Sequence, residues 1–97
     1  MTHSEEHPLA GKTVILNDNV KHDPRGMILP GVEFRVENWV DAITPCQSWR
    51  ALANWATLHY SARVMASGLP ADDEVVYGKI GSMGHCVHNS ELGEVKK

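Results

Sequence analysis

Residues 30–39 read Pro-Gly-Val-Glu-Phe-Arg-Val-Glu-Asn-Trp, and this stretch decides the fold. Val32, Phe34 and Val36 are apolar, and the residues between them are charged. Such strict alternation predicts an antiparallel strand with one face on a core and the other in water.

The alternation breaks at the end of this stretch, because Trp39 falls on the charged side of the predicted strand. Two outcomes are open. Either a bulge at Asn38 turns the tryptophan inward, or Trp39 is exposed beside the acidic residues Glu37 and Asp41.

The next segment predicts one helix over about residues 45–67. Thr44 and the proline after it suit a helix start, and Asn54 is a competing, later cap. Gly68 and the nearby proline predict the end of the helix. The helix carries an apolar stripe, the side that normally faces a core. The stripe consists of Trp55, Leu58, Ala62 and Met65.

Further strands are predicted on both sides of the helix, at residues 12–16, 74–80 and 85–88. A small open sheet is unstable alone. We therefore expect the strands to close into a compact barrel, with the helix over one opening. We therefore expect an α+β fold: a small SH3-like antiparallel β-barrel of four to five strands with one inserted α-helix. Residues 9–92 form this domain, after a flexible polar lead (1–8) and before a charged tail (93–97).

Composition excludes several classes of function. The 97 residues include 9 Lys+Arg and 12 Asp+Glu, a net charge of −3, which is unfavourable for binding nucleic acid through phosphates. No apolar stretch approaches the roughly 20 residues that cross a bilayer, so no membrane partner is expected. The polar N-terminus argues against a signal peptide, and two cysteines make no disulfide framework. We expect a cytoplasmic protein.

No residue pattern in the chain matches a catalytic signature, so no enzyme activity and no cofactor are expected. The one cluster with metal-ligand chemistry combines Cys86 and His88, which share a strand face, with the distant Cys46. Two nearby ligands are too few for a structural zinc site. A thiol or metal site using these three residues therefore stays an alternative, not the leading interpretation.

Tryptophan is more frequent than so small a core needs, with three residues near the passage from strand to helix. Tryptophan and arginine are enriched at interface hot spots, and acidic neighbours would set the charge of a partner. We therefore predict a partner-binding face. Its residues are Trp39, Trp49, Arg35, Arg50, Glu37 and Asp41.

Four runs of sequence resemble a family of small uncharacterised proteins encoded by phages and prophages of actinobacteria. These runs are residues 7–14, 30–39, 72–80 and 84–92. Relatives tend to show a second tryptophan after Trp39, where this chain has valine. The resemblance implies an accessory protein that acts in a bacterial cytoplasm on a host protein.

The leading hypothesis is thus a non-enzymatic module that binds a host bacterial protein. A homodimer would also cover exposed aromatic residues. An alternative of another class is a nucleic-acid-binding barrel that stacks bases on aromatic side chains, against which the net charge speaks.

Overall fold

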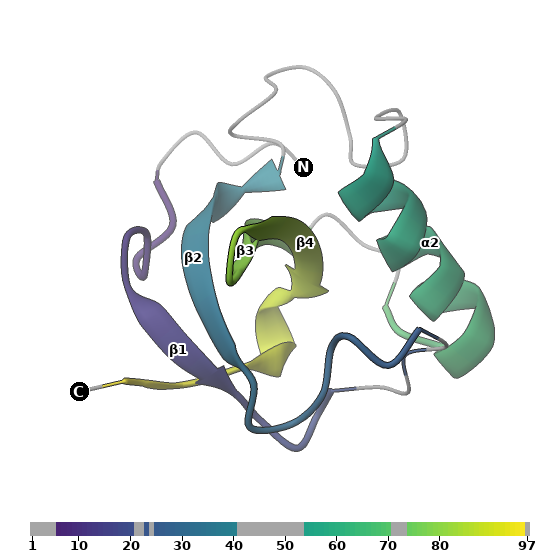
Figure 1. Ribbon diagram of the computed structural model, residues 1–97, viewed down its shortest axis with the longest axis horizontal. Helices are drawn as coiled ribbons and strands as arrows, with labels where there is room; N and C mark the ends of the chain where they lie inside the picture. The colour runs from purple at the N-terminus through teal and green to yellow at the C-terminus, as the bar shows by residue number, and fades with distance from the viewer. Residues whose placement is uncertain (1–5, 21–22, 24, 41–53, 71–73, 97) are drawn as a thin grey trace.

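Five antiparallel strands and one α-helix make up the described part of the chain. The computed structural model describes residues 6–20, 23, 25–40, 54–70 and 74–96. The elements follow one another from the purple N-terminal strand to the yellow C-terminal strand in Figure 1. They are β1 (Thr13–Leu16), β2 (Glu33–Trp39), α2 (Trp55–Ser67), β3 (Val75–Ile80), β4 (Met83–His88), the short 3-10 helix η2 (Asn89–Glu91) and β5 (Leu92–Val95).

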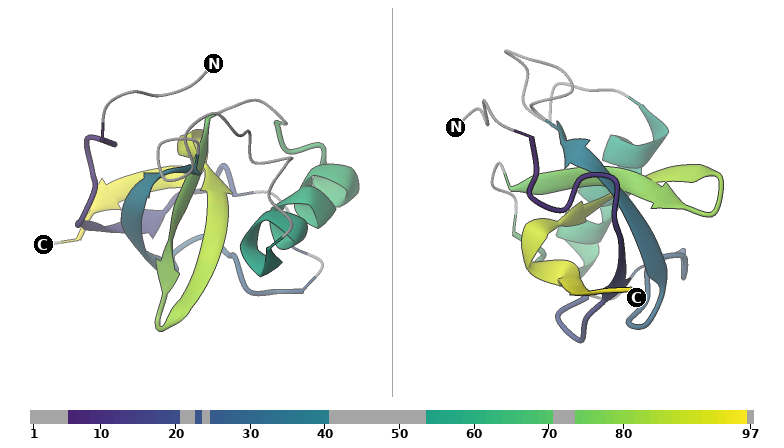
Figure 2. Two further views of the ribbon diagram at one scale, coloured as in Figure 1. Left: turned by 90° about the horizontal axis from the view of Figure 1, so that it is seen from above. Right: turned by 90° about the vertical axis from the view of Figure 1, so that its left-hand side faces the viewer.

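The strands form one curled sheet in the order β4-β3-β2-β1-β5, with every neighbouring pair antiparallel. The α+β class and the hairpin of the third and fourth strands are therefore confirmed. No ladder joins β4 to β5 in the described residues, so the sheet is open there and the SH3-like barrel stays a prediction. Helix α2 lies beside the sheet and packs against β4 (Figure 2).

A bulge in β2 decides where its tryptophan points. Val36 pairs with Gly78, but the next pair is Asn38 with Tyr77, so β2 has one extra residue at this point. The extra residue shifts the alternation by one position. Trp39 consequently turns inward and is only 8% exposed, which confirms the bulge alternative.

Helix α2 begins later than the predicted start at residue 45. Asn54 has extended backbone angles (φ −109°, ψ 168°), so no continuous helix passes through it. Its side chain accepts from the Thr57 N–H at 3.0 Å, and its own N–H donates to the Thr57 hydroxyl at 3.3 Å. This capping box gives α2 the later of the two predicted starts; the other candidate, Thr44, lies outside the described residues. The predicted end is confirmed, because Gly68 adopts the left-handed conformation with φ 68°.

The polar lead is ordered at least from His7, contrary to the expected flexible segment over residues 1–8. The His7 side chain is 5% exposed and its ring centroid lies 4.4 Å from that of Trp39. The backbone N–H of His7 donates to Asn38 Oδ1 at 3.0 Å, and the ring Nε2 of His7 lies 2.9 Å from Asn89 Oδ1. These contacts join the lead to two distant segments; residues 1–5 lie outside the described part.

The predicted charged tail is also wrong, because residues 92–95 form β5 and pair with β1. The Lys96 N–H extends this pairing with a hydrogen bond to the Thr13 carbonyl at 2.8 Å. Gly93 permits the close approach, since a Cβ there would lie 2.1 Å from the Ile15 carbonyl oxygen. Charge at alternate positions of this segment is therefore the outward side of an edge strand.

Candidate functional site

The tryptophan at the centre of the predicted binding face is part of the core. Trp39 packs in a buried cluster with Phe34 and Val36, and His7 covers its ring. The prediction that Trp39 belongs to an exposed binding face is therefore wrong. The cause is the bulge described above, which places the ring on the apolar side of β2.

The other predicted face residues are not brought together by the described structure. Arg35 and Glu37 are exposed on β2, two strands away from the strand that α2 contacts. Trp49, Arg50 and Asp41 lie outside the described residues. Of the predicted face, the described residues show Arg35 and Glu37 on the solvated side of β2, which is the ordinary surface of a half-buried sheet.

Two residues of the predicted apolar stripe of α2 face solvent instead of the core. Leu58 is 58% exposed and Met65 is 86% exposed, although both belong to the predicted apolar stripe. The buried side instead contains His59, Tyr60 and Arg63, together with two small residues. The expectation that the stripe faces the core is therefore wrong for Leu58 and Met65, whereas Trp55 packs against a buried cluster.

The solvent side of α2, which we call the outer face, is apolar and uncharged. The outer face consists of Leu58, Ser61, Ala62, Met65 and Ala66. His59 and Arg63 are the two residues of α2 that could carry a charge near neutral pH, and both are buried. Surface helices of monomers usually present charged residues on this side. An exposed apolar surface without charge is typical of a contact with another molecule.

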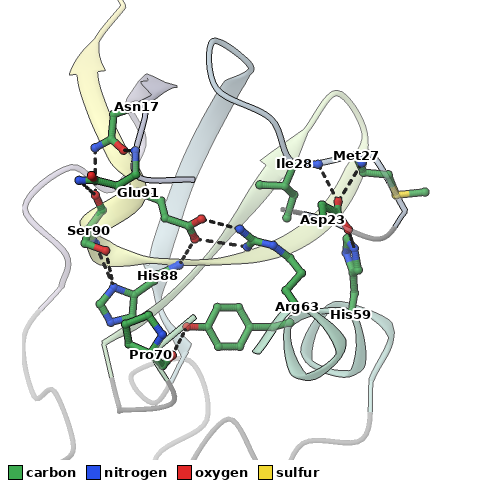
Figure 3. Close-up of polar contacts among 12 residues, drawn as sticks. Asn17, Asp23, Met27, Ile28, His59, Arg63, Pro70, His88, Ser90 and Glu91 are labelled. Carbon is green, nitrogen blue, oxygen red and sulfur yellow. Dashed lines mark hydrogen bonds and ion pairs between the residues drawn. The ribbon is translucent and has the colours of Figure 1, made fainter. Parts of the chain in front are cut away.

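A buried carboxylate joins the loop before β2 to α2. Asp23 accepts from the backbone N–H groups of Arg25 at 3.0 Å and of Met27 and Ile28 at 2.8 Å each. His59 Nε2 lies 2.7 Å from Asp23 Oδ1 (Figure 3). Because a carboxylate can only accept, Nε2 carries the proton of this bond.

Hydrogen bonding keeps this carboxylate ionised. Burial favours a higher pKa for Asp23, but the hydrogen bonds from the Arg25 N–H, from His59 and from the N–H groups of Ile28 and Met27 outweigh it. Together they lower the pKa of Asp23 to about 2. The loop is therefore fixed to α2 by a charge that persists throughout the physiological pH range.

Two further rings complete what we call the histidine cluster: Asp23, Trp55, His59 and His85. The Trp55 ring stacks on His59 with centroids 5.1 Å apart, and His85 meets the same two rings edge-on, 5.8 Å from His59 and 6.0 Å from Trp55. The guanidinium of Arg25 covers the Trp55 ring at 4.8 Å. Three elements meet here: the loop, α2 and β4.

A second buried polar pair fixes the far part of α2. Arg63 and Glu91 are both fully buried, and two guanidinium nitrogens donate to the two carboxylate oxygens (Figure 3). Glu91 also accepts from the His88 N–H at 2.8 Å. A buried charge is tolerated when it is paired and hydrogen-bonded in this way, so the pair holds α2 against η2.

The thiol or metal alternative gains no support from the described residues. Cys86 is 1% exposed, and burial raises the pKa of its thiol to about 12, so the thiol stays protonated. His88 Nδ1 accepts from the Ser90 N–H at 3.1 Å. Within the described ranges no three His, Cys, Asp or Glu side chains are grouped to hold a metal ion, and Cys46 lies outside these ranges. No helix there has the length and apolarity needed to cross a membrane.

Sequence reasoning missed the histidine cluster and the outer face for one reason. The partners of His59 and Arg63 are 36 and 28 positions away in the chain, so no local pattern contains them. One signal was present: α2 has no acidic residue in its first turn and no basic residue in its last. A surface helix that lacks such charges is a candidate for burial on two sides.

No protein-family model matches the chain, and no curated protein and no solved structure matches it either. The relation to small phage-encoded proteins therefore stays a prediction. What the chain does must be inferred from its own residues, and the two features that ordinary folding does not require are the outer face of α2 and the histidine cluster.

Proposed function

We propose that the protein is a non-enzymatic protein-binding module and that the outer face of α2 is its contact surface. The observation that carries this proposal is the orientation of the helix. Leu58 and Met65 are exposed while Arg63 on the same helix is fully buried. Removing a leucine or methionine side chain from water contributes about 1.5–3 kcal/mol, so a partner that covers both would gain substantial binding energy.

The shape and charge of the outer face define the surface it would fit. Ser61, Ala62 and Ala66 are small, and they allow another backbone or flat surface to approach the helix closely. Because the outer face carries no charge, the centre of the partner surface is apolar. The exposed acids Glu33 and Glu37 lie on β2, away from α2, and do not oppose an acidic partner.

The barrel closure, the kind of partner and the location of this module are further parts of the proposal. We propose a sheet completed as an SH3-like barrel, supported by the return of β5 to β1, which brings the two ends of the strand sequence together. We also propose a host bacterial protein as the partner, met in the cytoplasm, supported by the resemblance to phage-encoded proteins. The competing occupant of the outer face is a second copy of this chain.

Affinity capture with matched variants tests the proposed surface. The tagged protein is incubated with actinobacterial lysate, and Leu58→Glu and Met65→Glu are compared with wild type. Met83→Glu is the control. Like Leu58 and Met65, Met83 is an exposed apolar residue (48%), but it lies on the β3–β4 hairpin. We expect the control to retain the captured protein and each α2 variant to lose at least tenfold in affinity, about 1.4 kcal/mol.

Two results would count against this assignment. The first is equal capture by wild type and by α2 variants whose circular dichroism shows that they are folded. The second is loss of capture in the Met83→Glu control as well. Light scattering on the purified protein separates the two occupants: a wild-type dimer that Leu58→Glu converts to a monomer identifies the second copy as the partner.

A further inference from the structure

Two imidazole rings share one carboxylate inside the protein. His59 and His85 are 1% and 2% exposed, and their ring centroids lie 5.8 Å apart. Asp23 contacts His59 directly at 2.7 Å. One carboxylate can balance one imidazolium, so a second proton in this cluster would add a buried charge without its own counter-ion.

The described groups around His85 do not supply a second counter-ion. From α2 it faces His59 and Arg63, and from the loop it faces Asp23. Arg63 is positive and is already paired with Glu91. On β3 the register partner of His85 is Gly78, which has no side chain. Among the described residues, the cluster therefore holds one negative charge and is adjacent to two fixed positive ones, Arg63 and the Arg25 guanidinium over Trp55.

Hydrogen bonding also disfavours a second proton in the histidine cluster. The Nδ1 atoms of His59 and His85 are both buried, and among the described residues neither has a hydrogen-bond partner. A neutral imidazole can leave one nitrogen as an unused acceptor, but an imidazolium has two N–H donors. Protonation of His85 would thus bury an N–H group that has no acceptor among the described residues, which is more costly than an unused lone pair.

We propose that the histidine cluster is a proton-sensitive latch, which holds α2 against β4 and the loop at neutral pH and releases the helix when the medium becomes mildly acidic. The latch joins the three elements that meet at Trp55, His59 and His85. Because α2 also carries the outer face, the latch would regulate partner binding; that regulatory role rests on the proposed function, whereas the latch itself does not.

The direction in which pH changes the docking of α2 follows from the pKa of His85. Burial lowers this pKa below its usual 6.5, the charge of His59 lowers it further, Asp23 opposes the shift, and Arg63 adds to it. The docked helix thus disfavours the proton, and the released helix accepts it. The docking equilibrium is constant above pH 6.5 and falls below it, by up to about tenfold per pH unit for each proton taken up.

Hydrogen exchange on the whole protein tests the latch without any partner. Amide protection factors are measured at pH 7.5 and pH 5.0, corrected for intrinsic exchange. We expect the α2 amides to lose protection between these pH values, by at most about thirtyfold, since 1.5 pH units below 6.5 allow about a thirtyfold change for one proton. The amides of the β1–β2 and β2–β3 ladders should change less than twofold.

Three variants distinguish the latch from general acid instability. His85→Phe keeps an aromatic ring but cannot take up a proton, so α2 protection should become independent of pH. His7→Gln is the control, because His7 is also buried but contacts Trp39 and Asn89 instead of another histidine. It should retain the wild-type response. Leu58→Glu should retain it too, which separates this test from that of the outer face.

Several outcomes would overturn the latch. One is α2 protection that does not change between pH 7.5 and pH 5.0 in wild type. Another is an equal loss of protection in the sheet and the helix, which would mean global unfolding. A third is an unchanged response in His85→Phe. If His85→Phe does not fold, the wild-type comparison of helix and sheet still decides between these outcomes.

Discussion

Neutralising one member of the Arg63–Glu91 pair should cost about 3–5 kcal/mol of unfolding free energy. Glu91→Gln keeps the size of the side chain and an oxygen that can accept from the His88 N–H, but it removes the negative charge. Arg63 would then be a fully buried guanidinium facing a neutral amide. Arg63→Met has the converse effect, because it removes the guanidinium that pairs with a fully buried carboxylate.

The size of this loss of unfolding free energy follows from the burial of both side chains and from the charge that each single change leaves in the interior. Both side chains of the pair have 0% exposure, so water cannot replace the lost partner. The double variant, Arg63→Met with Glu91→Gln, removes both charges of the pair together and should cost less than the sum of the two single changes. We expect a coupling of at least about 2 kcal/mol. A domain of this size is stable by about 5–15 kcal/mol, so each single change removes a large part of the total.

Urea unfolding at pH 7.5, followed by tryptophan fluorescence and circular dichroism, gives the four free energies of this double-mutant cycle. The reasoning is refuted if each single change costs less than 1 kcal/mol, or if the two costs simply add. If a single variant is unfolded in buffer, folding of the double variant still demonstrates the coupling. An unfolded double variant beside folded single variants would contradict it.

Two more predictions concern the strand edge and the thiol. Gly93→Ala should lower stability by about 1–3 kcal/mol, because its Cβ would lie 2.1 Å from the Ile15 carbonyl oxygen; an unchanged melting temperature in calorimetry would contradict this close approach. In a Cys46→Ser background, Cys86 should react with iodoacetamide about a thousandfold more slowly in the native protein than in urea, since burial raises its pKa from 9.0 to about 12; similar rates in mass spectrometry would show that the thiol is accessible.

Local patterns predicted the parts of the fold that depend on local chemistry. The alternation from Val32 to Val36 predicted β2, and the break at Trp39 indicated the bulge that the structure contains. Gly68 predicted the end of α2 because a left-handed residue is needed there and glycine adopts that conformation without a steric cost. These signals act within a few residues, so the sequence contains them in readable form.

The parts that were missed depend on pairs that are distant in the chain. Buried His59 and Arg63 look unfavourable for a core until Asp23 and Glu91 are brought beside them. Because His59 and Arg63 are polar, helical periodicity places them on the solvent side of α2. The predicted orientation is therefore wrong for Leu58 and Met65, which are exposed. For the same reason the buried His7 was expected to be part of a flexible lead, because its contacts with Asn38 and Asn89 are 31 and 82 positions away.

The pairing of β5 with β1 has a consequence for synthesis of the protein. The first strand is made early, but its second neighbour is the last strand of the sheet, and the Thr13 carbonyl receives its hydrogen bond from Lys96. During translation, β1 can pair with β2 while its other edge stays open to a second nascent chain. Completion of the sheet must therefore follow the emergence of β5 from the ribosome, and this pairing of strands distant in the chain makes folding of the domain slow for its length.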